Sequence, residues 1–229
     1  MEIILIRHAE PAWMSDGESR LDPELTERGR EQARRLAEHA RGLRGPTELL
    51  VSPTRRSRET AEPLANAIGM TPTVLPWLEE ARLPKDWDGA PADRISTELR
   101  AARQRPAAEW WDGLPGGESF RDFHERVSTG LSALLTERGV RVTERDPPHA
   151  FEGAAQSAHR LFIVAHGGTN AVILSFLLGL SPVPWEWERF ASKHASITRA
   201  RAVEVAGGRI FALSLFGSVE HLPKDLRTR

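Results

Sequence analysis

The stretch Ile3-Ile4-Leu5-Ile6-Arg7-His8-Ala9-Glu10 decides how this chain folds. Its four consecutive apolar residues, three of them β-branched, are too few for a helix and predict a strand that is buried on both faces. The strand ends on Arg7 and His8, whose side chains seldom lie unpaired in a core. Because ligands of open parallel sheets bind at the carboxyl ends of the strands, we expect both side chains to face a crevice.

A second apolar run, residues 161–165, also ends on a histidine, His166, which is followed by Gly167 and Gly168. Residues 171–178, all apolar except Ser175, then have a length that suits a buried helix. This order places an imidazole beside the free N–H groups of a helix N-terminus, which favour anions. We predict that both histidines line one pocket, although either one alone is about as often an ordinary hydrogen-bonded core residue.

Composition excludes several classes of protein. The 229 residues carry a formal net charge of −1, with 40% hydrophobic and 28% charged residues, which is ordinary for a soluble protein and argues against general nucleic-acid binding. The absence of cysteine excludes disulfides, thiolate nucleophiles and cysteine-based metal sites. No signal-peptide pattern precedes the first strand, and every apolar run falls well short of the ~20 residues that span a bilayer. We expect a cytoplasmic protein.

Helical and strand spacings alternate along most of the chain. The expected elements are a helix capped by Thr26 and ended by Gly42, a strand at 48–51, a helix over 54–69 that starts late or kinks at Pro63, a strand at 71–75, a long helix after Ser119, and a hairpin of residues 197–205 and 210–216. We predict one α/β domain over residues 1–229, a three-layer αβα sandwich with a mostly parallel sheet and an antiparallel C-terminal edge. Residues 77–115 are expected to form a lid-like, loop-rich insertion with a short helix near 96–103, and residues 139–159 a polar surface loop.

The pocket predicted around the two histidines is electropositive, and its natural occupant is a tetrahedral dianion such as phosphate. Arg55, Arg56 and Arg58 follow the 48–51 strand, and one of them could turn inward to grip an oxyanion, although each alone is more often a solvated residue. The sequence has no metal-binding motif, so the best available nucleophile is an imidazole nitrogen. A carboxylic acid would then protonate the departing alkoxide.

The motifs together resemble those of the histidine phosphatase superfamily, which has the phosphoglycerate mutase-like fold. The matching segments, in family order, are residues 5–10, Leu25-Thr26-Glu27-Arg28-Gly29, Ser52-Pro53 to Arg56 with Thr60-Ala61, Pro115-Gly116-Gly117-Glu118-Ser119 before Arg126, and Val164-Ala165-His166-Gly167-Gly168. Each motif alone is weak, but together they are specific and cover residues 3 to about 222.

The resemblance implies roles for individual residues. His8 would be the nucleophile that becomes a phosphohistidine, while Arg7, Arg56 and His166 would act on the phosphoryl group. Glu80 would be the proton donor, with Glu79 as the alternative.

Gly167 and Glu10 would complete the substrate-binding set, and no metal or cofactor is implied. Pro11 and Met14 stand where the family often has Thr and Asn, and the family's Gly-x-Trp-Glu-Gly is matched only loosely by residues 85–89. The lid, and with it the substrate, is therefore expected to be individual to this protein.

Three functions fit these residues. The first is a metal-independent phosphatase that hydrolyses a small phosphomonoester through a phosphohistidine. The second is a phosphoglycerate mutase, although mutases resembling the family carry a longer insertion than the span from Glu80 to Gly116. The third is a low-activity protein that binds a phosphorylated ligand. The expected partner is a small phosphorylated metabolite rather than nucleic acid or membrane, and the C-terminal hairpin offers an edge for a homodimer.

Overall fold

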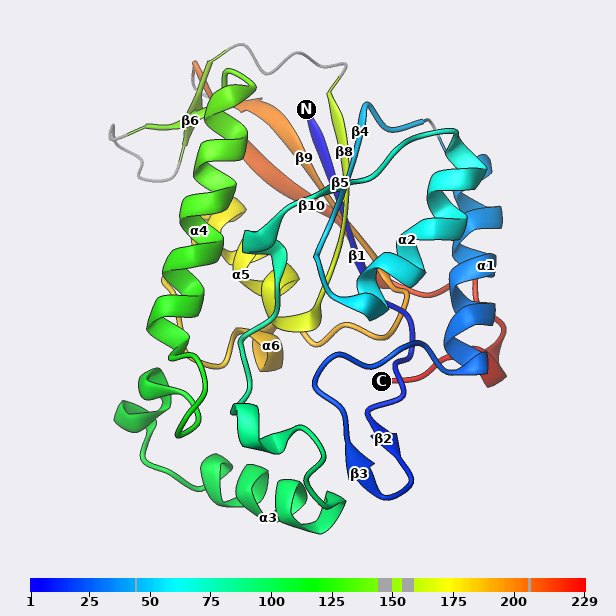
Figure 1. Ribbon diagram of the computed structural model, residues 1–229. Coiled ribbons are helices and arrows are strands. Elements are labelled where there is room, and N and C mark those ends of the chain that lie inside the picture. Colours follow the sequence, from blue (N-terminus) through cyan, green and yellow to red (C-terminus); the bar gives the residue numbers. More distant parts are fainter. Residues whose placement is uncertain (44, 144–149, 154–158, 206) are drawn as a thin grey trace.

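The computed structural model describes residues 1–229 except 44, 144–149, 154–158 and 206 (Figure 1). Within these residues the main sheet has eight strands in the order β5-β4-β8-β1-β9-β10-β7-β6. In chain order they are β1 Glu2–Arg7, β4 Glu48–Val51, β5 Thr73–Val74, β6 Arg141–Val142, β7 Phe151–Glu152, β8 Arg160–Ala165, β9 Ile197–Val205 and β10 Gly208–Ser218. The strands β5, β4, β8 and β1 are parallel, whereas pairing from β9 onward is antiparallel.

Helices cover both faces of this sheet, with α1 and α2 on one side and α4 and α5 on the other (Figure 1). The helices are α1 Glu27–Arg41, α2 Arg55–Ile68, α3 Ala92–Arg103, α4 Phe120–Glu137, α5 Gly167–Leu177 and α6 Glu186–Arg189, with 3₁₀ turns η1 Pro76–Leu78, η2 Lys85–Trp87, η3 Ala107–Asp112 and η4 Lys224–Leu226. A small ribbon, β2 Met14–Ser15 with β3 Glu18–Ser19, lies apart from the main sheet. The predicted three-layer α/β fold with an antiparallel C-terminal edge is confirmed. No helix in the described part of the chain is long and apolar enough to cross a membrane.

The opening strand is buried on both faces, as its apolar run predicts. Ile3 and Leu5 pack into the core beneath α4 and α5, whereas Ile4 and Ile6 pack into the core beneath α1 and α2. Each of these four side chains is at most 2% exposed. Since β1 lies in the middle of the sheet, between β8 and β9, the residues that follow it emerge at the centre of the carboxyl edge.

The helix that starts after Thr26 forms as predicted, and the Thr26 side chain accepts a hydrogen bond from the Gly29 N–H at 2.9 Å. Of the two alternatives predicted for the helix over Pro63, a late start or a kink, the late start is wrong, because α2 begins at Arg55 and continues through Pro63. Its buried stripe, with Ala61 and Leu64 fully inaccessible, packs on α1 and the sheet. This packing outweighs the hydrogen bond that proline removes.

The lid-like segment carries more regular structure than its sequence suggests. Within residues 77–115 α3 starts at Ala92, directly after Pro91 and four residues earlier than the predicted short helix. A proline ahead of the first turn and Asp93 within it both favour this start.

The segment 139–159, predicted as a surface loop, contains the two-residue strands β6 and β7, which extend the sheet. Two residues are too short a run to show a strand period, so only the buried Phe151 signals this pairing. Residues 144–149 and 154–158 of this segment lie outside the described residues.

Candidate active site

His8 and His166 meet at the carboxyl edge of the sheet, at the ends of the neighbouring parallel strands β1 and β8. The register pairs Arg7 with Ala165, so the next residue of each strand is a histidine. The two ring centroids lie 5.1 Å apart, and the residues are only 3% and 0% exposed. The structure thus brings together the two imidazoles that the sequence places on separate strand ends.

The surroundings of His8 fix its tautomer. Its Nδ1 lies 2.8 Å from the carbonyl oxygen of Ala9, which can only accept, so Nδ1 carries the proton and Nε2 keeps a lone pair. Burial, and then the charges of His166, Arg56 and Arg7, hold the pKa of His8 well below its ordinary value. His8 is therefore a neutral imidazole with an available nucleophilic nitrogen at neutral pH.

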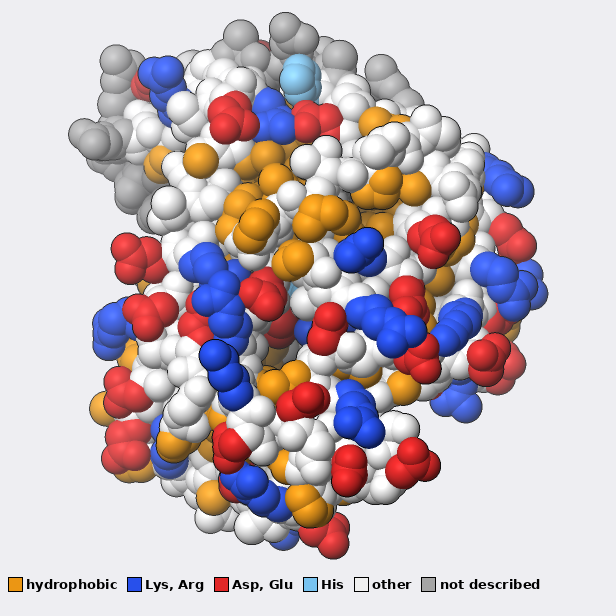
Figure 2. All heavy atoms as spheres, in the orientation of Figure 1, with side chains coloured by type: hydrophobic (Ala, Val, Ile, Leu, Met, Phe, Trp, Pro, Cys, Tyr) orange, Lys and Arg blue, Asp and Glu red, His pale blue; other side chains and the backbone are white. Residues whose placement is uncertain are grey.

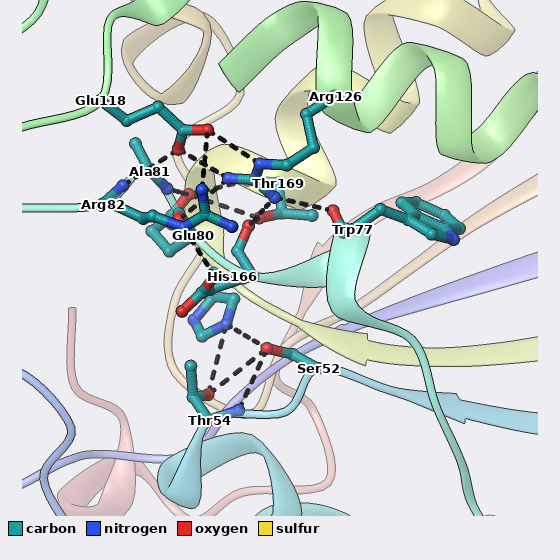
Figure 3. A network of polar contacts seen from close by, with 11 residues as sticks. Ser52, Thr54, Trp77, Glu80, Ala81, Arg82, Glu118, Arg126, His166 and Thr169 are labelled. Atoms are coloured by element: carbon teal, nitrogen blue, oxygen red, sulfur yellow. Dashed lines mark hydrogen bonds and ion pairs between the residues drawn. The ribbon is translucent and has the colours of Figure 1, made fainter. Parts of the chain in front are cut away.

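His166 is oriented from behind by hydroxyl groups. Its Nε2 lies 2.8 Å from the Ser52 Oγ and 3.4 Å from the Thr54 Oγ1 (Figure 3). A hydroxyl can donate to Nε2, and the neutral ring then carries its proton on Nδ1. That Nδ1 is buried and has no protein partner among the described residues. Burial, followed by the positive charges of Arg56 and Arg7, lowers the pKa of His166 well below its ordinary value.

Arg56 is the one member of its arginine cluster that turns inward. It is 4% exposed, whereas Arg55 and Arg58 are exposed and Arg55 forms ion pairs with Glu24 and Glu59. The Arg56 guanidinium stacks on the ring of Trp13 at 4.7 Å, and its Nε is buried and has no hydrogen-bond partner among the residues that the structure describes. Residue type alone leaves the three arginines nearly equivalent, and the fold buries Arg56, the one to which the family resemblance points.

Arg7 lies beside the imidazoles and is held from one side by the loop that precedes β9. Its Nη1 donates to the carbonyl oxygen of Ser192, its Nη2 lies 3.3 Å from the Nε2 of His194, and its Nε is buried without a partner among the described residues. Burial lowers the pKa of both Arg7 and Arg56. Guanidinium groups nevertheless stay charged in proteins, so the pocket holds two desolvated positive charges.

The Glu80 carboxylate occupies the N-terminus of α5. It accepts hydrogen bonds from the N–H groups of Gly168 at 2.9 Å and Thr169 at 3.1 Å. A Cβ on Gly168 would stand 2.5 Å from the Glu80 Oε1, so this approach requires glycine. The sequence predicts that these N–H groups bind the ligand anion; the structure instead uses two of them for Glu80 and leaves Gly167 as the first N–H of the helix.

Arg126 holds the loop that carries Glu80 (Figure 3). Its guanidinium donates to the carbonyl oxygens of Trp77, Glu79 and Glu80 at 3.0, 3.0 and 3.3 Å. The same group forms a two-pronged ion pair with Glu118 at 2.8 and 2.7 Å. The motif that contains Glu118 and precedes Arg126 therefore acts on the site through the backbone around Glu80.

Glu79 and Glu10 point elsewhere. The Glu79 carboxylate pairs with Arg82 at 2.9 Å near the surface, so the geometry favours Glu80 over Glu79 as the carboxyl group of the pocket. The Glu10 carboxylate accepts from the Thr26 hydroxyl at 2.8 Å and lies 3.5 Å from Arg28, which turns it toward the start of α1. The structure thus gives Glu10 a capping contact rather than a place among the imidazoles.

His194 belongs to the same cluster, although the sequence gives no sign of it. Its ring centroid lies 5.6 Å from that of His8, and it is 8% exposed. It comes from an irregular loop before β9, and β9 runs antiparallel to β1, so the amino end of β9 meets the carboxyl end of β1. Only that pairing, which no local pattern reveals, brings His194 to the site.

Figure 2 shows that the surface is hollowed near its middle, between the body of the domain and the segment that carries α3. The cluster as a whole offers a bare imidazole lone pair, two buried guanidiniums, an imidazole N–H and one carboxyl group. Such a set can bind a tetrahedral dianion, attack its central atom and move a proton.

The buried neutral histidines predict that the protein loses stability in mild acid. The unfolded chain takes up protons below about pH 6.5, whereas these histidines resist protonation in the folded state. Burial lowers the pKa of His194 to about 3 and holds the pKa of His8 and of His166 well below the ordinary value. The free energy of unfolding should fall between about pH 6.5 and 4, by up to about 1.4 kcal/mol per pH unit for each such histidine. Urea unfolding at pH 7.5 and pH 5 measures this loss. The loss of unfolding free energy between pH 7.5 and pH 5 should be smaller in His194→Asn than in wild type. An equal loss in that variant would contradict a buried, neutral His194.

Residues 3–211 match the family described as the histidine phosphatase superfamily, branch 1. A Salmonella paratyphi C protein named "Probable phosphoglycerate mutase GpmB" is 27% identical over 228 residues, which cover 97% of this chain and 95% of that protein. The solved structure of "Mycobacterial hydrolase 2" has a TM-score of 0.72 and 27% identity over 98% of this chain and 94% of its own. A mycobacterial glucosyl-3-phosphoglycerate phosphatase in complex with inorganic phosphate has a TM-score of 0.68 and 27% identity, over 97% of this chain and 99% of its own. The chain, as its motifs predict, belongs to the histidine phosphatase superfamily.

Proposed function

We propose that the protein is a metal-independent phosphatase that hydrolyses a small phosphomonoester through a phosphohistidine on His8. The observation that carries this proposal is the state of the His8 ring. A carbonyl acceptor fixes its proton on Nδ1, and the Nε2 lone pair stands among buried positive charges. A neutral nucleophile that is preorganised in a cationic pocket suits attack on a dianionic phosphoryl group.

In the first step the Nε2 of His8 attacks phosphorus, and the bond from phosphorus to the ester oxygen breaks. Arg7, Arg56 and the Nδ1–H of His166 stabilise the three equatorial oxygens, since each has a buried donor that no group in the described part of the chain pairs. The Gly167 N–H adds a further donor at the start of α5. The carboxyl group of Glu80 gives its proton to the departing alkoxide, so the alcohol leaves neutral.

In the second step Glu80 takes a proton from a water molecule, which attacks phosphorus from the side that the alcohol has left. The bond between phosphorus and Nε2 breaks, inorganic phosphate leaves, and His8 and Glu80 return to their starting forms. Arg126 contributes by holding the backbone of residues 77–80, which keeps the carboxyl group at the same place in both steps.

The second candidate is a phosphoglycerate mutase, which is favoured by the name of the Salmonella relative. A mutase returns the phosphoryl group to a sugar acid and must keep water away from the phosphohistidine. The lid segment between Glu80 and Gly116 has no buried residue in α3, and a lid of this kind gives little shielding from solvent. The mycobacterial phosphatase of similar fold and equal identity supports hydrolysis.

Phosphate release from an aryl phosphate in the presence of a chelator tests the proposed function. We expect wild-type protein to release phosphate and His8→Ala to lose about a thousandfold or more of this activity, because the nucleophile is gone. His39→Ala, which changes an exposed histidine of α1, serves as the matched control and should keep the activity. Isomerisation of 3-phosphoglycerate that is faster than phosphate release would favour the mutase. Release that survives in His8→Ala would contradict both enzymes.

The proton donor is identified by the dependence on the leaving group. Glu80→Gln should lower kcat/KM for an alkyl phosphate by about a hundredfold or more, because an alkoxide leaves poorly without a proton. The loss should be much smaller for a nitrophenyl phosphate, whose leaving group needs no acid. Glu79→Gln is the matched control and should change neither value more than a few-fold. A larger loss in Glu79→Gln than in Glu80→Gln would reverse the assignment.

A further inference from the structure

A chain of hydrogen bonds links Arg7 through His194 to Thr228. The Nη2 of Arg7 lies 3.3 Å from the Nε2 of His194, and the Nδ1 of His194 lies 2.9 Å from the Oγ1 of Thr228. A backbone contact supports this pairing, since the His194 N–H donates to the Thr228 carbonyl oxygen at 3.3 Å. The C-terminus therefore reaches the back of the pocket.

The roles of the atoms in this chain follow from chemistry. Arg7 has no acceptor, so the Nε2 of His194 must accept, and the neutral ring then carries its proton on Nδ1. That proton is donated to the Oγ1 of Thr228. The fixed tautomer in turn leaves Nε2 free to hold one edge of the Arg7 guanidinium.

Gln32 binds the Thr228 end of this hydrogen-bond chain. It is fully buried on α1, and its Nε2 donates to the Thr228 Oγ1 at 2.9 Å and to the Leu226 carbonyl oxygen at 2.7 Å. Its Oε1 accepts from the N–H of Glu10 at 2.8 Å, two residues after His8. The tail also packs here, because Leu222 and Leu226 belong to a small apolar cluster with Ala9. One buried amide thus ties the tail to the loop that carries the nucleophile.

We propose that Thr228, through His194, is a positioning residue that orients Arg7 for the phosphoryl group. With its two terminal nitrogens held from behind by Ser192 and His194, Arg7 presents its buried Nε and the remaining N–H groups to the ligand. Removing the Thr228 hydroxyl leaves the Nδ1–H of His194 without an acceptor. The ring then loses the anchor that sets its orientation, and the contact between its Nε2 and the Arg7 guanidinium loosens.

The inference rests on the proposed function only in taking Arg7 as a phosphoryl ligand. The test compares Thr228→Val, which keeps the shape and removes the hydroxyl, with Thr228→Ser, which keeps the hydroxyl. Arg229→Ala, the exposed neighbour, is the surface control. We expect Thr228→Val to weaken the binding of inorganic phosphate and to lower kcat/KM by about tenfold, Thr228→Ser to recover most of the loss, and Arg229→Ala to match wild type.

A spectroscopic readout separates positioning from a purely structural effect and does not depend on turnover. Two-bond ¹H–¹⁵N correlation of the imidazoles should show the single Nδ1–H tautomer of His194 in wild type and a mixture of the two tautomers in Thr228→Val, with the thermal midpoints of both proteins recorded alongside. A wild-type Nε2–H tautomer would overturn the proposal, and so would unchanged phosphate affinity in Thr228→Val. If phosphate binding depends on Thr228 as expected but wild-type protein hydrolyses no ester, only the proposed function is refuted.

Discussion

The parallel pairing of β1 with β8 is the constraint on which the rest of the site depends. Its register aligns Arg7 with Ala165, and each strand then continues into a histidine at the same edge of the sheet. Apolar packing on both faces of β1 holds that register, because a one-residue slip would exchange the side chains of the two faces and draw Glu2 or Arg7 into a core position. The pairing of the two strands is therefore enough to place both imidazoles side by side, without any polar contact between side chains.

Desolvation then determines what these imidazoles can do. Two buried guanidiniums beside two buried histidines keep both rings neutral, and the hydrogen bonds behind each ring leave one nitrogen of each toward the pocket. The carboxyl group of Glu80 is tethered beside them by the N-terminus of α5 and by the backbone that Arg126 holds. An empty pocket of this kind has unmet hydrogen-bond donors, and a phosphoryl group satisfies them.

The sequence predicts the parts of this site that lie at the ends of apolar strands and in family motifs, and it misses those that depend on long-range pairing. The apolar runs before His8 and His166 locate both residues, and the family resemblance points to Arg56, the arginine of its cluster that the fold buries. Nothing local marks His194, which arrives only because β9 pairs antiparallel with β1. Likewise, the sequence predicts that the N–H groups at the start of α5 bind the ligand, whereas in the fold two of them donate to Glu80.

The central claim is that His8 carries the phosphoryl group between two displacements. The stereochemical course at phosphorus tests it most directly, with a phosphomonoester made chiral by oxygen isotopes and transferred to an acceptor alcohol. Each in-line displacement inverts phosphorus, so two displacements predict overall retention of configuration. Overall inversion would mean that the acceptor attacks the ester directly, and would contradict a phosphohistidine on His8.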